Sequence, residues 1–206
     1  MMKKSIILLV ALTAFFCVNA QTNLTPAQIL GKAMGLVTSA KGVKADFIVS
    51  NSGYTGHGSV SASGNKFTVT MPDAKIWYNG KDLYTYNQNT NETTVVEPTP
   101  EELAQTNPFA YISSAQNNYS VSFSTVKKAG MYVLELIPAK KNGDVKRVTL
   151  TLRKSDFVPQ KIVVEPRNGN PVSAEITSFK TGINMTPGEF EYPKSKYPKT
   201  EIIDLR

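Results

Sequence analysis

Apolar residues near the beginning of the chain recur at the spacing of an α-helix. Thr25-Pro26-Ala27-Gln28 has the spacing of a capping box, with proline at the first helical position. The apolar positions that follow lie on one helical face: Ile29, Leu30, Ala33, Met34 and Val37. The pattern predicts one amphipathic helix at about 26–39, which ends near Gly42.

From Val43 the hydrophobic period changes from helical to two, which is typical of β-strands. In 145–153, for example, Val148, Leu150 and Leu152 alternate with polar residues, so one face of the strand is apolar and the other is exposed to solvent. Asn79-Gly80 suits a tight type I′ hairpin. The predicted strands are 46–49, 66–71, 76–78, 83–86, 93–96, 119–124, 131–137, 145–153, 160–165 and 172–179.

Two proline-marked segments interrupt the strands. Thr99 and Asn107 are cap residues, and each is followed by proline at the first helical position. They predict short helices at about 100–105 and 108–113. A sheet of about ten or eleven strands with one apolar face must curl or be covered by helices, and three helices are available. We therefore predict an α+β, mainly β, single domain at 21–206.

Composition excludes several kinds of chemistry. The 206 residues include one Cys and one His, so a Cys/His metal site, an iron–sulfur cluster or a catalytic pair with histidine has no ordinary means of assembly. His57, between two glycines, is expected in a solvated turn or at a strand edge. Glu101 and Glu102 fit a helix N-terminus better than an acid–base pair. We expect no enzyme, no metal and no cofactor.

The first twenty residues predict a secretory signal peptide. Lys3 and Lys4 precede the apolar stretch 6–18, and Val18-Asn19-Ala20 forms a small-residue cleavage site. The alternative is a lipoprotein signal at Cys17, but bulky phenylalanines precede that cysteine. Export to the periplasm follows from the first interpretation. The basic residues of the remaining chain are mixed with acidic ones, so we expect no nucleic-acid partner.

Several stretches carry a family pattern, in order along the chain. They are the hairpin IWYNGKDLYTYN at 76–87 with the turn Asn91-Glu92-Thr93, the segment NPFAYI at 107–112, and the ending Phe190-Glu191-Tyr192-Pro193 with IIDLR at 202–206. Together they resemble the periplasmic outer-membrane lipoprotein carrier family (LolA-like).

The resemblance implies a half-open, strongly curved antiparallel β-barrel under a lid of short helices, with an apolar cavity between them. It implies a carrier that takes acylated lipoproteins from an inner-membrane lipoprotein-releasing transporter to an outer-membrane acceptor. Thr68, with Lys66 nearby, stands where better-known carriers place an arginine that bonds to the lid. We expect a monomer.

The inward positions of the strands and the apolar stripe of the lid are the predicted acyl-binding residues. An alternating apolar face under helices is also what an ordinary filled core looks like, so this alternative stays open. A second alternative is a lipid- or lipoprotein-sensing periplasmic domain that acts through a protein partner. The predicted cavity residues are Phe47, Val49, Phe67, Val69, Met71, Trp77, Tyr84, Tyr86, Tyr132, Leu134, Leu136, Val148, Leu150, Leu152, Ile162 and Val164, and the predicted lid residues are Leu30, Met34, Phe109 and Ile112.

Overall fold

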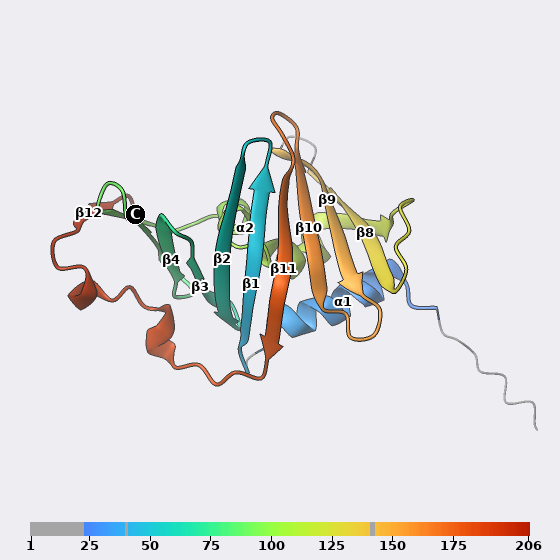
Figure 1. The fold of residues 1–206 in the computed structure, drawn as a ribbon, viewed down its shortest axis with the longest axis horizontal. Helices are drawn as coiled ribbons and strands as arrows, with labels where there is room; N and C mark the ends of the chain where they lie inside the picture. Colours follow the sequence, from blue (N-terminus) through green and yellow to red (C-terminus); the bar gives the residue numbers. More distant parts are fainter. Residues whose placement is uncertain (1–22, 40, 141–142) are drawn as a thin grey trace, which may run out of the picture.

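The computed structural model describes residues 23–39, 41–140 and 143–206, so the predicted signal segment 1–20 lies outside the described residues. In this part of the chain, twelve strands form one sheet in the order β12-β6-β5-β4-β3-β2-β1-β11-β10-β9-β8-β7 (Figure 1). The strands are β1 (Val43–Asn51), β2 (Tyr54–Ser63), β3 (Lys66–Thr70), β4 (Ala74–Tyr78), β5 (Leu83–Asn87), β6 (Glu92–Val96), β7 (Tyr119–Phe123), β8 (Met131–Pro138), β9 (Val145–Arg153), β10 (Pro159–Pro166), β11 (Val172–Thr181) and β12 (Glu201–Asp204).

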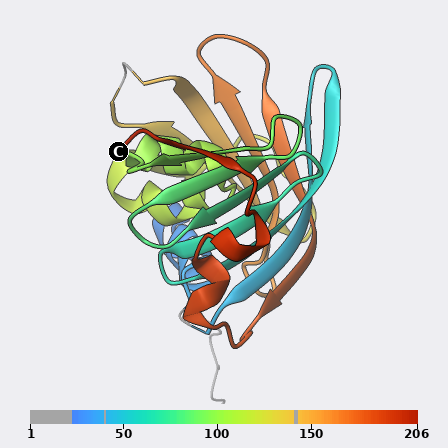
Figure 2. The same cartoon turned by 90° about the vertical axis from the view of Figure 1, so that its left-hand side faces the viewer.

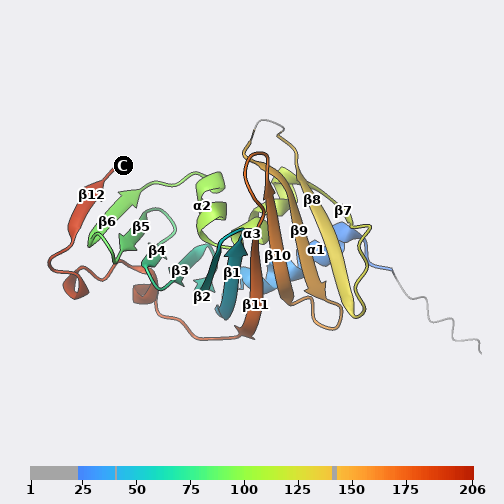
Figure 3. The ribbon, with the colours of Figure 1, turned by 45° about the horizontal axis from the view of Figure 1, so that its top comes forward.

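The sheet is curved and open, with helices on one face, which confirms the predicted fold class (Figure 3). All neighbouring strands are antiparallel except β12, which pairs with β6 in parallel. The helices are α1 (Pro26–Val37), α2 (Pro100–Thr106) and α3 (Ala110–Asn118), and the short 3-10 helices η1 (Pro187–Phe190) and η2 (Lys194–Lys196) lie in the C-terminal segment. None of the described helices is long and apolar enough to cross a membrane.

The capping predictions hold for two of the three helices. The Thr25 hydroxyl accepts from the Gln28 N–H, and Gln28 Oε1 accepts from the Thr25 N–H at 2.9 Å. Thr99 and Glu102 form the same reciprocal pair at α2. Such a pair satisfies backbone donors that the first helical turn leaves without partners.

The third helix differs from its predicted bounds. Asn107 Oδ1 accepts from the Phe109 N–H at 2.9 Å, and the Asn107 carbonyl accepts from the Ala110 N–H. These bonds close a turn at 107–109, so the helix begins at Ala110 and continues to Asn118 instead of spanning 108–113. The short polar side chain of asparagine supports a turn here as readily as a helix cap.

Strand β2 was not among the strands predicted from hydrophobic periodicity. It reads YTGHGSVSAS and holds His57 in a strand, paired with Ile48 of β1. The pairing of β2 with β3 begins only at Ser59, so His57 lies at an open edge of the sheet, one of its two predicted positions. The His57 side chain is exposed, as expected. Gly58 lies directly opposite Phe47, and a Cβ atom there would approach the Phe47 ring to 2.5 Å. The glycine is therefore needed because a large neighbour crosses over it.

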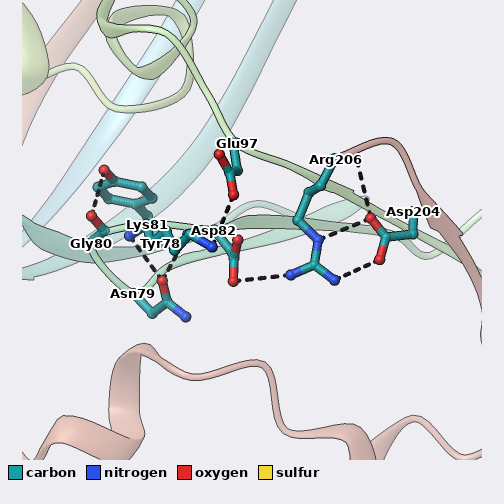
Figure 4. Close-up of polar contacts among 8 residues, drawn as sticks. All are labelled: Tyr78, Asn79, Gly80, Lys81, Asp82, Glu97, Asp204 and Arg206. Carbon is teal, nitrogen blue, oxygen red and sulfur yellow. Dashed lines mark hydrogen bonds and ion pairs between the residues drawn. The ribbon is translucent and has the colours of Figure 1, made fainter.

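The Asn79-Gly80 turn is placed one residue away from the prediction. Asn79 is the first corner of the turn, and its Oδ1 accepts from the Lys81 and Asp82 N–H groups at 3.0 and 2.8 Å (Figure 4). The central residues are Gly80, with φ +100°, and Lys81, which does not have a positive φ. A positive φ at the first central residue alone corresponds to type II′ and not type I′.

Two separate apolar layers form on the two faces of the sheet. The main core lies under the helices and includes Phe47, Leu134 and Leu150. The C-terminal segment, drawn in red in Figure 2, crosses the opposite face of β3 to β6. There Phe190 is buried, and the rings of Tyr192 and Tyr197 contact aromatic residues of β4 and β5.

Candidate apolar cavity

An apolar cavity of about 420 Å³ lies between the sheet and the helical layer. Strands β1, β3, β4, β10 and β11 form one wall, while α2 and the beginning of α3 form the other. Its volume falls within the range of ordinary ligand pockets, which is about 300–1,000 Å³. The lining residues are Phe47, Val49, Val69, Met71, Ile76, Ala104, Gln105, Thr106, Pro108, Tyr111, Ile162, Val164, Pro166, Val172 and Ala174.

The lining of this cavity is almost devoid of polar chemistry. None of its residues is charged, and the polar side chains are Gln105, Thr106 and the hydroxyl of Tyr111. Burial raises the pKa of Tyr111 to about 12, so this hydroxyl stays protonated at physiological pH. Such a cavity offers an apolar ligand burial with little competition from water, and it offers a reactive substrate no nucleophile with an adjacent base.

Six of the predicted acyl-binding residues line the apolar cavity: Phe47, Val49, Val69, Met71, Ile162 and Val164. Their strands lie near the centre of the sheet, where the curved sheet and α2 leave a space. Phe67, Leu134, Leu136, Val148, Leu150 and Leu152 also face the helices, but they are filled core positions. Tyr132 is half-buried against that core and stacks on Phe157, with ring centroids 6.0 Å apart.

The predicted inward orientation is wrong for Trp77, Tyr84 and Tyr86. Trp77 contacts Tyr192 edge-on at 5.4 Å, and Tyr86 contacts Tyr197 at 4.5 Å, both on the face covered by the C-terminal segment. The predicted strand 76–78 left out Lys75, which shares a face with Trp77 and lies over its ring at 5.6 Å. Alternation read over the whole of β4 would have marked the Trp77 face as the polar one. In the structure Ile76 and Tyr78 face the helices.

The predicted lid residues belong to the helical layer without lining the cavity. Leu30, Phe109 and Ile112 are buried in the main core, and Met34 packs against it. The cavity wall comes instead from α2 and its exit, through Ala104, Gln105, Thr106, Pro108 and Tyr111. Sequence analysis missed these residues because α2 is too short for its helical period to define an inner face. On β11, Val172 and Ala174 could have been found by continuing the period-two alternation.

Comparison with known proteins identifies the family. The sequence pattern described as "Outer membrane lipoprotein carrier protein LolA" matches residues 16–170, which is most of the chain. The protein belongs to this family. The match confirms the family resemblance and includes the hairpin and the 107–112 segment, whereas the ending at 190–206 lies outside the matched residues. No curated protein matches the sequence.

Solved structures confirm that this LolA-family protein has a shared fold. An uncharacterized conserved protein from Thermus thermophilus is similar with a TM-score of 0.57 and 14% identity, over 85% of this chain and 96% of that one. A putative outer membrane lipoprotein-sorting protein domain from Vibrio parahaemolyticus is similar with a TM-score of 0.50 and 13% identity, over 84% of this chain and 98% of that one. At these identities the likeness is one of fold.

Thr68, predicted from the resemblance to stand at the arginine position, faces away from α1, α2 and α3. Thr68 lies opposite Trp77 in the sheet, and both line a polar groove beneath the C-terminal segment. Its neighbour Phe67 points to the helical layer, beside Phe109 and Ala110. In this LolA-family protein, therefore, the Thr68 side chain lies on the face covered by the C-terminal segment and not on the face covered by α1, α2 and α3.

A second cavity of about 470 Å³ lies next to α2 and α3, against the connection between β8 and β9. It shares Ala104, Gln105 and Tyr111 with the apolar cavity, so these residues form a common wall. Its remaining lining is more polar and consists of Pro100, Ser114, Asn118, Tyr119, Pro138, Ala139, Lys140, Gly143, Asp144 and Val145. The two cavities thus share Tyr111 and differ in the chemistry of their remaining lining.

Proposed function

We propose that the protein is a periplasmic carrier that binds the acyl chains of lipoproteins and moves them from the inner to the outer membrane. The observation that carries the proposal is the uncharged cavity between sheet and helices. Membership in a family described as outer membrane lipoprotein carriers supports it.

Acyl chains suit this cavity because they are recognised by area and not by hydrogen bonds. Each buried CH₂ group contributes about 0.8 kcal/mol, so a wall of apolar side chains is sufficient to hold a chain. Met71 adds an adaptable side chain to that wall. The helical layer would keep the chains away from water, while the polar part of the ligand remains outside the apolar space.

The proposal requires that the purified protein holds acylated ligands. We expect native mass spectrometry to show lipid or lipoprotein bound to protein isolated from cells. We also expect the protein to release a triacylated lipoprotein from membranes into a soluble complex. If neither measurement shows an acylated ligand, the carrier proposal fails.

The same preparation distinguishes a carrier from a sensor that acts through a protein partner. A sensor would be recovered from a pull-down in a stable complex with a membrane-bound regulator, and it would not transfer lipoproteins to acceptor membranes. A carrier would show transfer. Transfer from donor to acceptor membranes, followed with a labelled lipoprotein, is therefore the deciding measurement.

A further inference from the structure

Tyr111 combines deep burial with an unsatisfied hydroxyl. The residue is only 7% exposed. Within the described part of the chain, the Tyr111 hydroxyl has no hydrogen-bond partner. The pKa of Tyr111 is raised by burial and by the charge of Tyr119, and neither of these causes is a hydrogen bond. A polar group buried without a partner is costly, and native proteins usually satisfy such groups.

The Tyr111 hydroxyl is nevertheless within reach of a ligand. Among the described residues, Asp82 Oδ1 is the only fully enclosed side-chain oxygen or nitrogen without a partner, so the Tyr111 hydroxyl retains accessible surface. Tyr111 lines two cavities, so its side chain belongs to the wall that they share. The hydroxyl can therefore donate to an acceptor that enters either space.

The two cavities have the polarity expected for the two halves of an amphiphile. The cavity on the sheet side has no charged lining residue, whereas the second cavity includes Lys140, Asp144 and Asn118. Tyr111 and Gln105 belong to both linings, so they mark the boundary between them. A lipid with its chains in the first space would bring its chain-linking carbonyls to this boundary.

We propose that Tyr111 is a specificity-determining residue whose hydroxyl donates to an ester or amide carbonyl that joins acyl chain to headgroup. This assignment rests on the proposed acyl-binding function and narrows its ligand to carbonyl-linked lipids. Alkyl ethers of the same chain length fill the same space, but they offer a weaker acceptor at the boundary. The protein therefore discriminates by linkage as well as by apolar area.

The test compares a diester lipid with its diether analogue. Dipalmitoylglycerol and dihexadecylglycerol ether are titrated into the purified protein, and displacement of a naphthylamine reporter dye gives the two dissociation constants. A neutral hydrogen bond corresponds to about a two- to tenfold preference for the diester in the unmodified protein. We expect Tyr111→Phe to abolish this preference while leaving diether binding within about twofold.

Tyr119→Phe is the matched control, because Tyr119 lines the second cavity but not the first and so does not belong to the shared wall. It should keep the diester preference. Thermal melting checks that both variants fold. An unchanged preference in Tyr111→Phe, or an equal loss in Tyr119→Phe, would overturn the assignment of Tyr111.

The two proposals fail in different ways in this experiment. If both lipids bind with equal affinity to the unmodified protein, the carbonyl contact is wrong and the acyl cavity stands. If neither lipid displaces the dye, the acyl-binding proposal fails and the Tyr111 assignment falls with it.

Discussion

The rings of Tyr84 and Tyr192 stack nearly parallel, with an interplanar angle of 3° and centroids 5.2 Å apart. Tyr84 is the second residue of β5, and Tyr192 comes from the segment that follows η1. Thr93 of β6 donates a hydrogen bond to the Tyr192 hydroxyl at 3.1 Å. These contacts hold the C-terminal segment on the sheet face opposite the cavity.

Tyr192→Ala should destabilise the protein without weakening ligand binding. Loss of the aromatic packing is expected to lower the free energy of unfolding by about 1–3 kcal/mol. Tyr192→Phe keeps the stack and loses the hydrogen bond with Thr93, so its cost should be about 0.5–1.5 kcal/mol. Urea unfolding measures both. Weaker dye binding by folded Tyr192→Ala would contradict the placement of Tyr84 outside the cavity.

A charge at Val164 should abolish acyl binding, whereas the same charge at Val163 should not. The two valines are adjacent in β10 and both are half-buried, but Val164 lines the cavity and Val163 lies opposite Ser173 and Thr149 on the other face. A carboxylate in an apolar cavity is poorly solvated and repels apolar ligands. We expect at least a tenfold loss of lipid affinity for Val164→Asp, which corresponds to about 1.4 kcal/mol.

Equal effects of the two aspartates on lipid affinity would refute the assigned faces of β10. Leu150 is a poorer site for this experiment, although it faces the helices as predicted. It is only 1% exposed in the filled core, so a charge there is expected to unfold the protein.

Gly58→Ala should reduce the space available to the ligand. A Cβ atom at this position would approach two atoms of the Phe47 ring to 2.5 and 2.7 Å and would also overlap Met71 Sδ. Both side chains line the cavity, so their displacement fills it. We expect weaker binding of long-chain lipids, together with an overpacking cost of about 1–3 kcal/mol.

Gly31→Ala provides the contrasting glycine substitution. Nothing lies within 4 Å of a Cβ atom at Gly31, which is in the interior of α1. This variant should raise the free energy of unfolding by about 0.5–1 kcal/mol because alanine is the better helix former. Lipid affinity should not change, and a similar loss in both variants would argue against the Phe47 explanation.

The C-terminal ion pairs predict a pH dependence in the acid range. Arg206 forms a bidentate pair with Asp204, at 2.6 Å for Nη2 to Oδ2, and also contacts Asp82 at 3.2 Å (Figure 4). Hydrogen bonds from the Arg206 side chain and backbone lower the pKa of Asp204 from 3.8 to about 2. A lowered carboxyl pKa in the folded state stabilises that state above the ordinary pKa.

This stabilisation should be complete above about pH 4 and should be lost as the pH falls towards about 2. Urea unfolding across this range measures it in the unmodified protein and in Arg206→Ala. The difference between the two should shrink as the pH decreases. A difference that stays constant between pH 5 and pH 2 would show that the pair with Asp204 contributes nothing.

The strand and helix patterns were predictable where local chemistry is decisive. The capping box at Thr25 and the cap residue Thr99 were identified from local sequence because each cap is made by residues three positions apart. The alternation of Leu150 and Leu152 with threonines gave the correct faces of β9 because one side of that strand is polar. Strand β2 was not predicted because the reason for Gly58, the ring of Phe47 on the neighbouring strand, is not visible within the segment itself.

The sequence by itself determined the curved sheet with a helical layer and the LolA-type resemblance, since hydrophobic period, caps and turn residues act over a few positions. The tertiary structure alone determined which positions of the apolar face pack in a filled core and which line a cavity. Leu150 and Val164 both face the helices, yet one is in the core and the other lines the cavity. It also decided that Trp77 and Tyr84 pack under the C-terminal segment, because the partner of an apolar face is set by the chain's path through space and not by its local pattern.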